Sequence, residues 1–194
     1  MALTDSAVLK PGAVYYFVAE VGTDAPLDLK NPETPWTNIG HTSLEDIASF
    51  SSEGGEATTL GTAQAPNLRV AYSPRSEALA INLQQFDEES LKLYYGSNSV
   101  TVASNGHDLL GVPQAPTPTE KAFLAIFVDG ENIFGYWAPK ASIFRGEDVE
   151  ISDFESLASL PLAVTPVVHE GATWAYAVLP IQPYVAPEED EGEA

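Results

Sequence analysis

The chain has 194 residues, no cysteine, and 28 acidic against 8 basic side chains, which gives a formal net charge of −20. This length suits one domain, and the missing cysteines exclude disulfides, thiolate metal sites and cysteine nucleophiles. The charge argues against passive binding to nucleic acids or to anionic membranes, because both depend on clustered Lys and Arg. No run of apolar residues is long enough to span a bilayer as a helix.

Short runs rich in Val, Ile, Tyr and Phe lie between 14 Gly and 15 Pro, which is typical of a mainly β domain. Residues 12–21 are too uniformly apolar for alternation, so we predict a strand that is covered on both faces. Residues 43–46 have the spacing of a capping signal, but the run after them is short and favours one turn. Gly54-Gly55-Glu56 is interpreted as a tight turn.

Residues 56–83 form a candidate long hairpin with few lysines to block its edges. Within this hairpin, Leu79, Ile81 and Leu83 share one face of a strand. A helix is predicted from Asp87, its capping residue, to Tyr95, with Gly96 as the stop. Three of its side chains have the spacing of a core-facing stripe, namely Leu91, Tyr94 and Tyr95.

Two hairpins are predicted in the second half of the chain. The first joins residues 121–128 to 133–139, with a face of Phe123, Ala125 and Phe127 opposite Ile133, Gly135 and Trp137. The second joins residues 162–168 to 172–179 around His169-Glu170-Gly171. Residues 151–160 are ambiguous between a short helix and a loop.

The remaining segments are polar or rich in proline. We expect one domain over residues 1–186, with an N-terminal arm at 1–11 and flexible loops at 24–35 and 97–118. Asn105-Gly106 inside the second loop is a turn signal. Residues 187–194 carry five acids and are interpreted as a disordered acidic tail, so residues 1–186 keep a net charge of −15.

Candidate catalytic and metal-binding residues form no convincing set. The three histidines are far apart and none is paired at helical spacing; they are His41, His107 and His169. Asp46, Glu53, Glu56 and Asp87 could supply a hydrolase carboxylate pair, but their spacing along the chain says nothing about their separation in space. Residues 129–132 or 188–193 could offer oxygens to calcium, yet the twelve-residue loop pattern is missing. We therefore predict no enzyme activity, no cofactor and no metal.

The order of four segments resembles the major tail protein, or tail tube subunit, of long-tailed, non-contractile bacteriophages of actinobacteria. The resemblance spans about residues 11–180. Its segments are a strand ended by a Gly-Thr-x-x-Pro turn at 11–26, Trp36 followed by a Gly-x-x-Ser turn at 40–43, the Gly-rich run at 54–61, and the strand, helix and Tyr94-Tyr95-Gly96 stop at 79–96.

The resemblance implies an antiparallel β-sandwich or half-barrel with one short flanking helix. It also implies a virion protein, assembled in the host cytoplasm, whose copies form six-subunit rings that stack into a tube. A tape measure protein, a tail terminator and distal tail proteins would be its partners. DNA would pass through the tube without sequence-specific binding, and no membrane would be involved.

A conduit for DNA should repel it, so lumen-facing acids are the candidate functional residues. We select Glu53, Glu56 and Glu77 for this role. Five aromatic side chains are expected in the core or at subunit interfaces, namely Trp36, Trp137, Trp174, Tyr94 and Tyr95. The alternative function is a β-sandwich module that binds carbohydrate or decorates a capsid through exposed Trp and Tyr. A carboxylate hydrolase is a third and weaker alternative.

Overall fold

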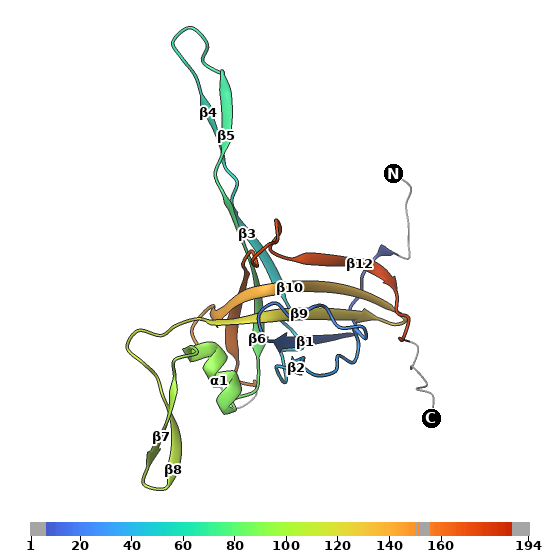
Figure 1. The fold of residues 1–194 in the computed structure, drawn as a ribbon, viewed down its shortest axis with the longest axis vertical. Coiled ribbons are helices and arrows are strands. Elements are labelled where there is room, and N and C mark those ends of the chain that lie inside the picture. The colour runs from blue at the N-terminus through green and yellow to red at the C-terminus, as the bar shows by residue number, and fades with distance from the viewer. Residues whose placement is uncertain (1–6, 150, 152–155, 188–194) are drawn as a thin grey trace.

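The computed structural model describes residues 7–149, 151 and 156–187, and it shows a mainly β chain with one helix (Figure 1). Its elements in chain order are β1 (Ala13–Ala19), β2 (Thr37–Asn38), β3 (Ser49–Gly54), β4 (Ala57–Leu60), β5 (Arg69–Tyr72), β6 (Arg75–Leu83), α1 (Glu88–Tyr95), β7 (Val100–Ser104), β8 (His107–Gly111), β9 (Thr119–Asp129), β10 (Asn132–Arg145), β11 (Leu160–Pro166) and β12 (Ala177–Pro183).

The main sheet is antiparallel and has the strand order β2-β1-β9-β10-β11-β6-β3, with β12 also paired to β10. The long strand β10 joins two layers, because its first half pairs with β12 and its second half with β11. The register of β10 against β9 shifts between Ala138 and Ala141, where Pro139 interrupts the ladder. The predicted antiparallel sandwich or half-barrel with one flanking helix is confirmed.

The core lies between the two layers and follows from alternation along the strands. Leu79, Ile81 and Leu83 of β6 are all buried on its inner face, as predicted. Strand β1 is covered on both sides, because Tyr16 faces the inner core and Phe17 packs with Trp36 in a second cluster. The expectation for residues 12–21 is therefore confirmed, with narrower strand bounds.

The β9–β10 hairpin forms, but one detail of the expected pairing is wrong. Phe127 pairs with Phe134 and Ala125 with Tyr136, whereas Ile133 pairs with Val128. Ile133 and Trp137 therefore belong to the outer cluster and not to the face of Phe127. The difference is one residue of register, which a tight turn fixes and composition does not reveal.

The second expected hairpin is wrong. Strands β11 and β12 do not pair with each other; both pair with β10, along different halves of it. Strand β11 ends opposite Ala141 and β12 begins opposite Trp137, so residues 167–176 connect two strands that follow each other along one edge of β10. A turn does form at 169–172, where the Ala172 N–H donates to the His169 carbonyl at 3.0 Å.

Several other local expectations are met. The helix begins after Asp87 and ends at Tyr95, although Leu93 and Tyr94 are its buried apolar residues while Leu91 and Tyr95 are half-buried. At 43–46 the chain makes a turn in which the Ser43 hydroxyl accepts from the Asp46 N–H. The acidic tail beyond residue 187, the first six residues of the predicted arm, and residues 152–155 of the ambiguous stretch lie outside the described residues.

Residues 24–35 form an irregular segment that is tied to the body. Asp28 accepts hydrogen bonds from the Tyr184 hydroxyl at 2.7 Å and from the Lys30 N–H at 2.8 Å. The Trp36 indole N–H donates to the Asp24 carbonyl at 3.2 Å. Residues 97–118 contain the β7–β8 hairpin, whose turn residues Asn105 and Gly106 have the positive φ angles expected of a tight hairpin turn.

Candidate assembly surfaces

A long hairpin projects far beyond the sandwich (Figure 1). It consists of β3 and β4 on one side and β5 and β6 on the other, which confirms the predicted hairpin and extends it back to Ser49. We call residues 57–72 the distal arm. Strands β3 and β6 form the base of the hairpin within the main sheet, whereas the distal arm is a separate two-stranded ladder.

The break between base and distal arm lies at Gly54 and Gly55, which both have positive φ. These glycines do not form the expected tight turn; the chain continues outward in the same hairpin. Pro74 stands opposite, and a Cβ at Gly54 would lie 2.2 Å from its carbonyl oxygen. Glycine is therefore required at the point where the ladder is interrupted. The turn of the hairpin lies farther out, at residues 61–68.

The distal arm carries apolar side chains that nothing in the described part of the chain covers. Their relative exposures lie between 53% and 72%, and they are Leu60, Leu68, Val70 and Tyr72. Leu60 lies on one face of the arm and Val70 and Tyr72 on the other. An isolated two-stranded hairpin is marginally stable in water, and apolar side chains exposed together mark an interaction site. The distal arm therefore has the properties of an element that is completed by another molecule.

The base of the hairpin also presents an open strand edge. Strand β3 ends the sheet order and pairs with β6 alone among the described strands. Its sequence contains no Lys, Arg or Pro, which are the residues that commonly block edges. By contrast, β12 carries Pro180 and Pro183, which remove backbone donors from that edge of the sheet.

The three candidate lumen acids are not equivalent in the structure. Glu53 pairs with Ser76 and is exposed, whereas Glu77 pairs with Ser52, so these two acids lie on opposite faces of the hairpin. The half-buried Glu77 carboxylate accepts a hydrogen bond from the Tyr176 hydroxyl, which raises the pKa of Tyr176. Glu56 is exposed at the break in the hairpin.

Small residues surround Glu53 on its face of the sheet. Because side chains alternate, this face of β3 and β6 carries Ser51, Ser76, Ala78 and Ala80. Bulky side chains of the same strands, such as Leu79, point into the core instead. The result is a smooth, weakly acidic surface next to the open edge.

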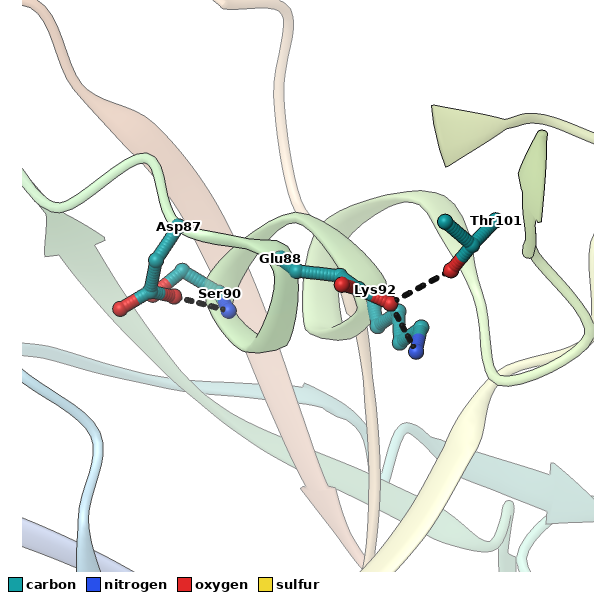
Figure 2. A network of polar contacts seen from close by, with 5 residues as sticks. All are labelled: Asp87, Glu88, Ser90, Lys92 and Thr101. Atoms are coloured by element: carbon teal, nitrogen blue, oxygen red, sulfur yellow. Dashed lines mark hydrogen bonds and ion pairs between the residues drawn. The ribbon is translucent and has the colours of Figure 1, made fainter. Parts of the chain in front are cut away.

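A second hairpin, β7–β8, projects on the opposite side of the body (Figure 1). It too exposes apolar side chains, including Val100, Val102 and Leu109. Figure 2 shows how it is tied to the helix: the Thr101 hydroxyl donates to Glu88 at 2.8 Å, and Lys92 pairs with the same carboxylate at 2.6 Å. These two contacts hold the pKa of Glu88 below its ordinary value.

The helix is short, and its start is fixed by one residue. The Ser90 N–H donates to the Asp87 carboxylate at 2.8 Å (Figure 2), and this hydrogen bond is the main cause that lowers the pKa of Asp87. At the other end, the Tyr94 hydroxyl donates to the Glu147 carbonyl at 2.7 Å, and the Tyr94 and Tyr95 rings meet edge to face. The helix is therefore capped at its start and hydrogen-bonded to the body at its end.

The tryptophans are mostly part of the packing. Trp36 is 7% exposed, and Trp137 is half-buried in the same outer cluster. The Trp174 ring lies against that of Trp137, tilted by 55° with 5.5 Å between the ring centroids, and Trp174 is 42% exposed. Trp174 is thus the one tryptophan with an exposed ring that a carbohydrate could stack on.

The described residues contain no group of three or more His, Asp or Glu side chains placed to hold a metal ion. The candidate calcium segment at 129–132 is the β9–β10 turn, where Asp129 accepts from the Lys10 N–H at 2.9 Å. Among the same residues, no helix is both long and apolar enough to cross a membrane.

Comparisons with known proteins agree with a structural role. A family model described as phage tail tube protein matches residues 1–182. The chain is similar to "Major tail protein Gp23" of Mycobacterium phage L5, with 37% identity over 183 residues, which covers 88% of this chain and 89% of the relative. It is also 36% identical, with the same coverage, to "Major tail protein Gp23" of Mycobacterium phage D29.

Proposed function

Because the chain belongs to the phage tail tube protein family, we propose that its copies form six-subunit rings that stack into the hollow tube of the tail. It is a major tail protein, a structural component of the virion and not an enzyme. The ring, the tube and the role of the tube as a conduit for the genome are our proposals, and they go beyond membership of the family. The observation that supports them most strongly is a fold with an open β edge and two projecting hairpins.

Ring closure needs contacts within a layer, and the open edge of β3 can supply them. Pairing of β3 with a strand of the neighbouring copy would satisfy its free N–H and C=O groups and extend the sheet around the ring. Stacking needs contacts between different surfaces, because head-to-tail association generates an open filament. The two hairpins, which point in opposite directions, suit contacts between layers.

The bore of the tube must let DNA pass. We assign the small-residue face of β3 and β6 to the bore, with Glu53 as its main acid and Glu56 near it. Glu77 faces the other way and binds Tyr176, so its contribution to the bore would be indirect. Six copies carry on the order of −120 formal charges, but screening beyond about 8 Å means that lumen-facing acids alone act on DNA.

Tube assembly takes place in the host cytoplasm in this proposal. The tape measure, terminator and distal tail proteins are the partners of the tube. The like charge of the subunits opposes their association and has to be overcome by buried apolar area. Salt screens that repulsion, so assembly should be faster at high ionic strength.

The test is polymerisation of the purified full-length chain, followed by light scattering and by electron microscopy. We expect rings or tubes above a threshold concentration, with a lower threshold in high salt. A chain that stays monomeric under all conditions, and binds glycans on an array, would favour the decoration or carbohydrate module instead.

A further inference from the structure

The distal arm contains one charged side chain, Arg69, in a chain with a net charge of −20. Arg69 is exposed and takes part in none of the ion pairs among the described residues, which use Lys92, Lys121 and Lys140. It is the direct cross-strand partner of Leu60 in the β4–β5 ladder, so the two side chains share a face. The arm thus presents an apolar side chain next to an unpaired cation.

A groove with the complementary character lies between α1 and the strands β1 and β2. Its volume is about 460 Å³, and buried or half-buried apolar side chains line it, including Val18, Ile39 and Leu93. This volume lies within the range of about 300–1,000 Å³ of pockets that hold small molecules, so the groove has room for two side chains.

The acids at this groove are not equally available. Glu20 is paired with Lys121 at 2.5 Å, and Asp87 caps the helix. Glu88, the neighbouring acid on α1, is bound to Lys92 and Thr101 (Figure 2). Glu89 also lines the groove, but it is exposed and has no side-chain partner among the described residues. One acid of the groove is therefore free to receive a cation.

The distal arm and the helix lie toward opposite ends of the long axis of the molecule (Figure 1). A tip at one end and a receptor at the other is the arrangement that a head-to-tail contact requires. We propose that Leu60 and Arg69 of one copy enter the groove beside α1 of the next copy along the tube, where Arg69 pairs with Glu89. This inference rests on the proposed function and names the contact that joins successive layers.

Charge reversal tests the pair. R69E and E89R should each raise the threshold concentration for polymerisation at least about tenfold, because every ring makes the contact several times over. The double variant R69E/E89R restores opposite charges across the contact and should return the threshold to within about threefold of the original. The matched controls are R75E at the base of the hairpin and E131R in the β9–β10 turn, both at exposed positions.

The outcomes separate the two proposals. If the unmodified chain polymerises and R69E behaves like R75E, or the double variant is no better than the single ones, the groove contact is wrong and the tube stands. If the unmodified chain never polymerises, the proposed function fails and the contact with it. Melting curves of all variants should coincide, because both side chains are exposed.

A second measurement uses the absence of cysteine from the chain. Arg69→Cys and Glu89→Cys in one chain, treated with a short bismaleimide after polymerisation, should give a ladder of covalent dimers, trimers and longer products. Arg69→Cys with Glu131→Cys serves as the control and should give none. A ladder in the control of equal yield, or none in the test variant, would overturn the contact.

Discussion

The distal arm can be removed without touching the core, which makes its role in assembly directly testable. Gly54 and Arg75 are register partners at the end of the base ladder. A two-residue Asn-Gly turn can therefore replace residues 55–74 and close the hairpin at that point. None of the deleted residues belongs to either buried cluster. We expect the melting temperature of the shortened monomer to change by no more than about 2 °C.

The expected loss in assembly follows from the exposed apolar surface of the arm. Burying one such side chain completely is worth about 1.5–3 kcal/mol, and more than half of each is exposed in the monomer. The four apolar side chains together then contribute about 4–7 kcal/mol per subunit before entropic costs. This corresponds to about three to five powers of ten in the threshold concentration for polymerisation.

Sedimentation of the shortened and full-length chains over a concentration series measures this threshold. A smaller change, V70S/Y72S, keeps the arm but removes two apolar side chains from one of its faces, and should give an intermediate shift. For comparison, T58S/A71S lies on the face of Leu60 and Arg69 but alters only small side chains, so it should shift the threshold by less than V70S/Y72S. If the shortened chain polymerises within about threefold of the full-length threshold, the arm is not an assembly element.

Three further predictions concern the bore, the helix and the response to acid. The double variant E53K/E56K should slow genome ejection from particles while tubes still form; normal ejection kinetics would reject the assignment of these acids to the bore. D87A removes the helix cap and should cost about 1 kcal/mol in chemical denaturation, whereas the exposed E45A should cost almost nothing. The pKa values of Asp87, Glu88 and Glu20 are lowered in the folded chain, so the stability that they contribute is complete above their ordinary values of 3.8–4.5 and declines as pH falls below them. In a series from pH 6 to pH 3, the melting temperature should therefore start to decrease once the pH is below about 4.5. An increase of the melting temperature in that range would contradict the prediction.

Local signals in the sequence were sufficient for most of the elements. Alternation of Leu79, Ile81 and Leu83 located the inner face of β6, and Asp87 with Gly96 bounded the helix. These features depend on side chains a few residues apart. The pairing of β11 and of β12 with β10 depends instead on the length of β10, which has room for one strand along each half. Nothing within residues 160–183 reports that length, so a simple hairpin was expected.

The assembly surfaces were predictable in part. The long hairpin could be recognised from its two apolar strands. Gly54 and Gly55 suggested a turn, because the sequence does not reveal the strand register that places Pro74 beside them. The division of Glu53 and Glu77 between two faces follows from the same register. The Leu60–Arg69 pair was missed, because it requires knowing that residues 61–68 form the turn.

In the proposed tube this fold is completed by copies of itself, which electron cryo-microscopy of tubes assembled from the purified chain would make visible. We expect six copies per ring, the open edge of β3 paired with a strand of the adjacent copy, and the distal arm buried against the next ring. Tubes in which the β3 edge and the arm remain in solvent, or preparations that contain monomers alone, would contradict this expectation.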